Sequence, residues 1–301
     1  MIKNIFLSLI IACLILACTE RVDVKLDSSY SRLVVDGYIS PESGTYHVAL
    51  TSTASYFYNE SAPRVVNAMM RLTDGSNTYI LNETVPGISG IYETDSTFEG
   101  NIGRTYTLEV ELSEDIGGSR NYEATDQLRD VTNLDSINAV FHPEWETEGI
   151  WTIQLWAQEP GNEVNYYMFN LYRNGKLLTD TLNKKIISDD ALFNGSYMNG
   201  IDVMYLNHAH AWETIYPGDT IMLQMSGITK EYFYFIDQVR QAGFNIPFFS
   251  GPPANVEGNV SNGAVGFFAA YSNSFAKAKV GNWKGETDNT HKVKEKIPSK
   301  E

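Results

Sequence analysis

The sequence predicts a mainly β protein with two β-sandwich-type domains, the second of which carries one packed α-helix. Three observations support this class. Apolar and polar residues alternate with a period of two in many short runs, and turn dipeptides such as Asp74-Gly75 and Asn174-Gly175 separate some of them. A single stretch near residue 235 has helical spacing instead. Strands with one buried and one solvated face are typical of antiparallel sandwiches.

The first predicted domain covers residues 32–127. It begins with the strand-like runs "RLVVDGYIS" and "TYHVALTSTASYF", and "AMMRLTDGSNTYIL" then reads as a hairpin that turns at Asp74-Gly75. The clearest strand is "TYTLEVELSE", in which apolar residues alternate with threonine and glutamate. Together with "GIYETD", this run resembles an immunoglobulin- or prealbumin-like sandwich. The apolar positions of that strand are Tyr106, Leu108, Val110 and Leu112.

The second predicted domain covers residues 128–280. Its strands are expected in "INAVF", "GIWTIQLWAQ" and "DTIMLQMSGI", with a second hairpin around Asn174-Gly175. "TKEYFYFIDQVRQAG" has the spacing of an amphipathic helix, with Thr229 as N-cap and Gly243 at its carboxyl end. The charged residues 281–301 are expected to be a disordered tail.

An apolar run from Ile5 to Ala17 precedes both domains. It is shorter than the roughly 20 residues of a membrane-spanning helix and matches the core of about 7 to 15 residues in a secretory signal. Its end, "ILAC", resembles a bacterial lipobox. We therefore expect residues 1–17 to be a lipoprotein signal peptide cleaved after Ala17, acyl chains such as palmitate on Cys18, and a tether over residues 18–31. The alternative is an ordinary signal peptide with a chance cysteine.

Composition limits the partners. The formal net charge of −15 disfavours nucleic acid, whose binding needs clustered positive charge. Cys13 would leave with the signal peptide, so a mature domain without disulfides must be stabilised by its core. We expect no cofactor, and the lipid bilayer, reached through the amino-terminal acyl chains, is the first expected partner.

The carboxyl-terminal part contains the most distinctive sequence segment, "FNIPFFSGPPANVEGNVSNGAVGFFAAYS". Its prolines favour extended backbone, and its glycines allow tight turns or close backbone contacts before the final strand. With "RLVVDGYIS" and "TYHVALTSTASYF", it resembles the lipoproteins of Bacteroidota that contain domain of unknown function 4249. The resemblance implies an outer-membrane location and a gene that is frequently encoded beside TonB-dependent transporters, and it supplies no established catalytic residues to carry over.

Candidate chemistry is sparse. His208 and His210 in "NHAHAW" would point the same way on a strand and could chelate a metal ion, but surface or hydrogen-bonded histidines are the alternative. We expect Asp189-Asp190 to lie in a solvated loop, because adjacent strand residues face opposite ways and glycosidases need two carboxyls across a substrate. The motifs of zinc proteases, serine hydrolases and P-loop enzymes are absent from the sequence.

Two surface features are also expected. Runs of aromatic residues could stack on sugars or peptides, although sandwich cores use the same residues. The best candidates for a contact loop are Tyr56, Phe57 and Tyr58. An Asp-Ser/Thr pattern resembles an O-glycosylation motif of exported Bacteroidota proteins, and an intact mass with no excess over the lipid would contradict it. The hydroxyls concerned are those of Ser96, Ser136, Thr181 and Thr220.

Together these features predict a non-catalytic accessory or binding subunit, anchored by lipid to the outer membrane beside a TonB-dependent transporter. The anchored protein could face either the periplasm or the cell surface. The first alternative is a stand-alone surface module that binds glycan or peptide. The second is a hydrolase, which would need converging carboxylates or a histidine-bound metal in one pocket.

The anchor is tested by Cys18→Ala. Because this substitution removes the thiol that would be acylated, the variant should be extracted from membranes without detergent, as fractionation and mass spectrometry would show. Retention of the variant in the membrane fraction would contradict lipid anchoring at this cysteine.

Overall fold

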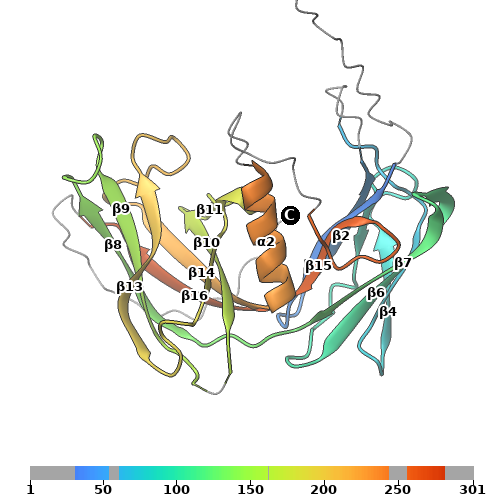
Figure 1. Ribbon diagram of the computed structural model, residues 1–301, viewed down its shortest axis with the longest axis horizontal. Coiled ribbons are helices and arrows are strands. Elements are labelled where there is room, and N and C mark those ends of the chain that lie inside the picture. Colours follow the sequence, from blue (N-terminus) through green and yellow to red (C-terminus); the bar gives the residue numbers. More distant parts are fainter. Residues whose placement is uncertain (1–30, 54–60, 162, 244–255, 282–301) are drawn as a thin grey trace, which may run out of the picture. The chain divides into compact units, whose positions relative to one another are not determined.

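A computed structural model describes residues 31–53, 61–161, 163–243 and 256–281, which form one compact unit from Ser31 onward. Within these residues the chain is mainly β with one α-helix, which confirms the predicted class (Figure 1). Cys18, the contact loop Tyr56–Tyr58 and the tail beyond Gly281 lie outside the described residues. No helix in the described part is long and apolar enough to cross a membrane.

Eight strands form the first sheet in the order β15-β1-β2-β5-β4-β3-β6-β7. Neighbouring strands pair antiparallel except β1 and β15, which pair in parallel. The strands are β1 (Leu33–Ile39), β2 (His47–Ser52), β3 (Met69–Thr73), β4 (Thr78–Glu83), β5 (Ile91–Glu93), β6 (Thr105–Ile116), β7 (Ser119–Gln127) and β15 (Val265–Ala270).

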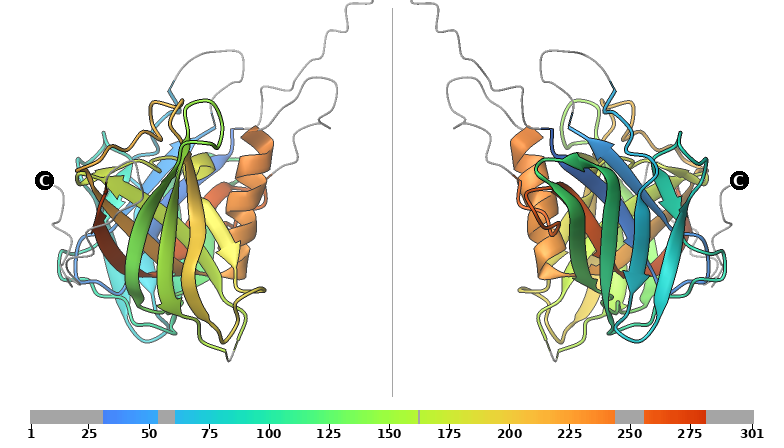
Figure 2. Two further views of the ribbon diagram at one scale, coloured as in Figure 1. Left: turned by 90° about the vertical axis from the view of Figure 1, so that its left-hand side faces the viewer. Right: turned by 90° about the vertical axis from the view of Figure 1, so that its right-hand side faces the viewer.

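This sheet curls around its own core, as the right-hand view of Figure 2 shows. The predicted hairpin is confirmed, because β3 and β4 pair and Gly75 takes a φ of 83° in the turn between them. The alternation in β6 is also confirmed. Its four apolar side chains, Tyr106, Leu108, Val110 and Leu112, are all buried.

Side chains close the gap between the two end strands, β7 and β15. The Asn259 amide nitrogen donates to the carbonyls of Thr125 in β7 (3.0 Å) and Phe268 in β15 (2.7 Å), and its oxygen accepts from the Phe268 N–H (3.0 Å). The Asp126 carboxyl accepts from the Ala270 N–H at 2.7 Å. The first sheet therefore has its two ends linked through hydrogen bonds to side chains.

Two further sheets bury a second core between them. The three-stranded sheet has the order β13-β9-β8, and the five-stranded sheet has the order β11-β10-β14-β16 with β12 also paired to β10. Trp151, Ile153 and Leu155 are fully buried in β9, as their spacing predicts. The strands are β8 (Leu134–His142), β9 (Ile150–Gln158), β10 (Tyr166–Arg173), β11 (Lys176–Leu177), β12 (Ile186–Asp189), β13 (Tyr197–Asn207), β14 (Thr220–Ile228) and β16 (Ser272–Lys279).

The predicted hairpin between β10 and β11 is confirmed. Asn174 and Gly175 both have positive φ, 49° and 81°, as a tight hairpin turn of this kind requires. The short 3₁₀ helix η1 (Leu182–Lys184) then leads into β12.

The helix α2 (Lys230–Gly243) begins where the sequence predicts. Thr229 accepts a hydrogen bond from the Tyr232 N–H at 3.4 Å, the pattern of an N-cap. Its buried stripe includes Tyr232, Phe235 and Ile236, which pack with residues of β15, β10 and β14 in a third cluster. Figure 1 shows α2 between β10 and β15. The helix therefore contacts both the first and the five-stranded sheet.

The parallel pairing of β15 with β1 returns the last part of the chain to the first sheet. Gly266 makes this approach possible, because a Cβ atom there would lie 2.0 Å from the Val35 carbonyl oxygen. This agrees with the close backbone contact expected of these glycines. The division into residues 32–127 and 128–280 stays a prediction.

Asp126 is a buried acid at the junction of these elements. Its carboxyl accepts from the Thr229 hydroxyl (2.8 Å) as well as from the Ala270 N–H. Burial raises the pKa of Asp126 from 3.8 to about 7, although both hydrogen bonds lower it. Between these values the folded chain binds a proton that the unfolded chain does not, so the contribution of Asp126 to stability is present at low pH and lost as pH rises through about 7.

Asp126→Asn should remove this pH dependence. An amide can accept from Ala270 and donate to the Thr229 hydroxyl, so the geometry is retained. As the pH is raised from about 5 to about 8, the unfolding free energy of the wild type should fall by about 2–3 kcal/mol relative to that of the variant. Urea unfolding at each pH measures this difference. The exposed Glu111→Gln is the control. Parallel pH profiles for wild type and Asp126→Asn would contradict a proton bound at Asp126.

Candidate functional site

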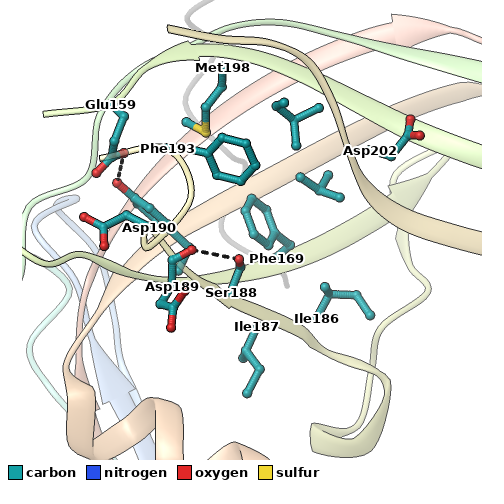
Figure 3. Close-up of a pocket in the computed structure, with 13 residues that line it drawn as sticks. Glu159, Phe169, Ile186, Ile187, Ser188, Asp189, Asp190, Phe193, Met198 and Asp202 are labelled. Atoms are coloured by element: carbon teal, nitrogen blue, oxygen red, sulfur yellow. Dashed lines mark hydrogen bonds between the residues drawn. The ribbon is translucent and has the colours of Figure 1, made fainter. Parts of the chain in front are cut away.

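A cavity of about 200 Å³ lies among β9, β10, β12 and β13. Figure 3 shows that three carboxyl groups lie at one end, that a fourth lies on the opposite side, and that apolar side chains form much of the wall. This volume is below the roughly 300–1,000 Å³ typical of small-molecule sites. The lining residues are Glu159, Tyr167, Phe169, Ile186, Ile187, Ser188, Asp189, Asp190, Phe193, Met198, Ile201, Asp202 and Val203.

Glu159 is the most deeply buried acid of the cavity, with 1% of its surface exposed. It follows β9 in phase with the buried positions of that strand, so the backbone directs its side chain inward. The Tyr167 hydroxyl donates to one of its oxygens, and the Asn165 amide donates to the other at 3.0 Å. Each carboxylate oxygen therefore has a protein donor.

Asp190 corrects the expectation of a solvated loop. It is 2% exposed, and its carboxyl accepts from the Asn165 N–H at 3.0 Å. Its carbonyl accepts from the N–H groups of Phe193 (2.7 Å) and Asn194 (2.8 Å), which forms a tight turn after β12. The turn rotates Asp190 inward. Asp189 is exposed as expected, but it lies at the end of strand β12 and not in a loop.

The two buried acids influence each other. Burial raises the pKa of Glu159, and the negative charge of Asp190 raises it further, whereas the hydrogen bonds from Tyr167 and Asn165 lower it. Burial and then Glu159 raise the pKa of the Tyr167 hydroxyl, which stays a donor. The end of the cavity that carries the carboxyl groups thus contains two acids, Glu159 and Asp190, which accept hydrogen bonds from uncharged donors.

Asp202 lies apart from this pair in Figure 3, and it comes from β13. Its Oδ1 atom is buried and has no hydrogen-bond partner among the described residues. Phe169, Phe193 and Met198 lie toward the middle of the view. A small, largely apolar space with its acids at the edges can hold a few water molecules or a small organic group.

His208 and His210 are not brought to a common face. β13 ends at Asn207, so both lie in a turn and not on a strand as expected. The His208 ring packs edge-on against Phe141 and Tyr216, and His210 Nδ1 lies 2.8 Å from a carboxylate oxygen of Glu213. Within the described residues, no group of three or more His, Cys, Asp or Glu could hold a metal ion.

The four proposed glycosylation sites differ in access. Ser96, Thr181 and Thr220 are exposed, and Ser136 is half-buried in β8. Their modification remains a prediction.

A group of exposed aromatic rings lies elsewhere on the surface. Trp145, in the turn between β8 and β9, stacks on His142 with ring centroids 3.9 Å apart and faces Tyr205 of β13 at 6.5 Å. Trp145 is 39% and Tyr205 56% exposed. We name these three residues the aromatic patch. Sequence reasoning did not single it out, because its members come from separate segments.

The comparisons with known proteins give one family. The family described as Domain of unknown function (DUF4249) matches residues 19–275, which is most of the chain. No curated protein matches.

Tyr167→Phe tests how the cavity contributes to stability. Removal of the hydroxyl leaves one oxygen of buried Glu159 without its tyrosine donor, so we expect a loss of about 1–3 kcal/mol in unfolding free energy near pH 7. Tyr205→Phe, which changes an exposed hydroxyl, should leave the urea midpoint unchanged. Equal midpoints for all three proteins would mean that the Tyr167–Glu159 bond stabilises nothing.

Proposed function

The chain belongs to the DUF4249 family, and we propose that it is a lipid-anchored outer-membrane protein of Bacteroidota type with a non-catalytic accessory role. Its partner is a TonB-dependent transporter. The lipobox-like ending at Cys18 supports the anchor, and the short apolar run before it supports export. The described sheets and loops would then be held close to the membrane.

The aromatic patch is the observation that carries a binding role. Large aromatic side chains are enriched at the buried centres of protein interfaces, because they provide a large contact area with few rotatable bonds. Here the indole of Trp145 is held by stacking on His142 and stays accessible beside Tyr205. A pre-positioned ring of this kind loses little conformational entropy on docking.

The carboxyl pair supports a role without catalysis. Glu159 receives hydrogen bonds from Tyr167 and Asn165, and Asp190 joins the start of β10 to the turn after β12. Acids used in this way hold strand ends together. The space beside them is small for a substrate.

A hydrolase is the alternative that one observation favours. Glu159 and Asp190 are two buried carboxyls at one cavity, and burial raises the pKa of Glu159 as a general acid would require. Turnover of labelled oligosaccharides or peptides by the wild type and not by Glu159→Gln would establish this alternative. A stand-alone glycan- or peptide-binding module is the other alternative, and it requires affinity without a protein partner.

Co-purification tests the accessory role. A chain tagged at its carboxyl end would be isolated from gently solubilised native outer membranes, and its partners would be identified by mass spectrometry. We expect a transporter in stoichiometric amount with the wild type and at least tenfold less with Trp145→Ala/Tyr205→Ala, because truncation of central aromatic residues costs about 2 kcal/mol or more.

The matched control is Tyr234→Ala on α2, whose side chain is similarly exposed at 47%. This variant should retain the transporter. If wild type brings no transporter, the accessory role is wrong. If wild type and the double variant bring equal amounts, the aromatic patch is not the docking surface.

A further inference from the structure

Three tyrosine rings lie in a nearly parallel row outside the cavity and outside the aromatic patch. Tyr38 of β1 stacks on Tyr271, which lies between β15 and β16, with centroids 4.9 Å apart and planes inclined by 12°. The row continues from Tyr271 to Tyr232 of α2, whose ring centroid lies 6.2 Å away and whose plane is inclined by 7°. The row runs from an exposed end, with Tyr38 at 45% exposure, to a buried one, with Tyr271 at 4% and Tyr232 at 9%. We name these residues the tyrosine row.

The electrostatics of the tyrosine row show that its hydroxyls influence one another. Within the described residues, no hydrogen bond joins any of the three hydroxyls to another protein group. Burial raises the pKa of Tyr271, and the nearby oxygens of Tyr38, Tyr232, Tyr172 and Asp36 raise it further. Phenol hydroxyls can both donate and accept, so those of the tyrosine row can bind water or a hydroxyl-bearing ligand.

Opposite charges lie beside the tyrosine row. Asp36 shares the face of β1 that carries Tyr38, and Lys185 lies between η1 and β12. Although solvent reaches Asp36, the surrounding protein raises the pKa of its carboxyl and the charge of Lys185 lowers it. Burial lowers the pKa of Lys185 to about 8, against the effect of Asp36. Among the described residues, Asp36 and Lys185 are not joined by an ion pair within 4.0 Å.

Lys185 is held in place by a row of amides on the five-stranded sheet. Its ammonium donates to Asn170 Oδ1 at 3.0 Å, and the same oxygen accepts from the Thr179 hydroxyl at 2.9 Å. The Tyr172 hydroxyl donates to the neighbouring Gln224 amide at 3.0 Å. These contacts lie on buried or half-buried side chains of β10 and β14. The polar groups are therefore positioned before any ligand arrives.

We propose that the tyrosine row, together with Asp36 and Lys185, binds a neutral saccharide ring. Tyr38 stacks on Tyr271 and meets the Tyr46 ring at 75°, and the 45% of Tyr38 that is exposed offers an aromatic surface for the C–H face of a sugar. The hydroxyl rim of the sugar meets one carboxylate acceptor, one ammonium donor and phenols that can do both. The carboxylate of Asp36 beside the site and the net charge of −15 disfavour a polyanionic ligand.

This proposal goes beyond the accessory role, because it assigns a ligand class at a surface apart from the aromatic patch. The experiment uses the purified full chain without a transporter, in a detergent that lacks a sugar headgroup. Oligosaccharides of glucose, mannose, galactose, xylose and N-acetylglucosamine serve as probes at millimolar concentration. Binding is measured by ligand-observed NMR and calorimetry.

We expect at least one of these oligosaccharides to bind. Tyr38→Ala and Asp36→Asn should each weaken that binding roughly tenfold or more, and Tyr38→Phe should weaken it less because the stacking ring remains. Tyr234→Ala and Trp145→Ala/Tyr205→Ala should bind as wild type, whatever the outcome of co-purification. Unchanged melting temperatures would show that the variants fold.

Three outcomes would overturn the proposal. No probe binds the wild type, or Tyr38→Ala binds as tightly as wild type, or Tyr234→Ala weakens binding as much as Tyr38→Ala. Each outcome leaves the accessory role to its own test, since that test depends on the aromatic patch.

Discussion

The carboxyl of Asp126 is the contact on which the arrangement of the described chain depends. It receives the Ala270 N–H at the end of β15 and the Thr229 hydroxyl at the start of α2, while its own backbone belongs to β7. One buried side chain thus joins an end strand, the returning strand and the helix. Because α2 carries Tyr232 and the residue after Ala270 is Tyr271, the same contact positions two rings of the tyrosine row.

Much of the fold is local in origin and can be predicted from sequence. Period-two spacing locates β6 and β9, Asp-Gly and Asn-Gly dipeptides locate the turns at Gly75 and Gly175, and Thr229 marks the start of α2. Each signal is contained in a few neighbouring residues, and each depends on backbone geometry that operates at short range.

Two of the buried acids can also be recognised in the sequence, although by a weaker pattern. Glu159 continues the buried phase of β9, and Asp126 continues that of β7 after Ala124. An acid in phase with buried apolar residues indicates a carboxyl with internal donors. Asp190 gives no such signal, because the turn that buries it depends on hydrogen bonds from Asn165, Phe193 and Asn194. The tyrosine row likewise joins β1, α2 and the β15–β16 junction, whose proximity no local pattern encodes.

The parallel pairing of β1 with β15 has a consequence for how the chain reaches its native state. A chain is synthesised from its amino end, so Leu33–Ile39 must wait until Val265–Ala270 exists before that edge acquires its neighbour. Contacts between such distant segments slow folding, and an unpaired edge can meanwhile join the wrong strand. Premature release of the nascent chain would therefore leave the earliest strand open to aggregation, however well the hairpins beside it had formed.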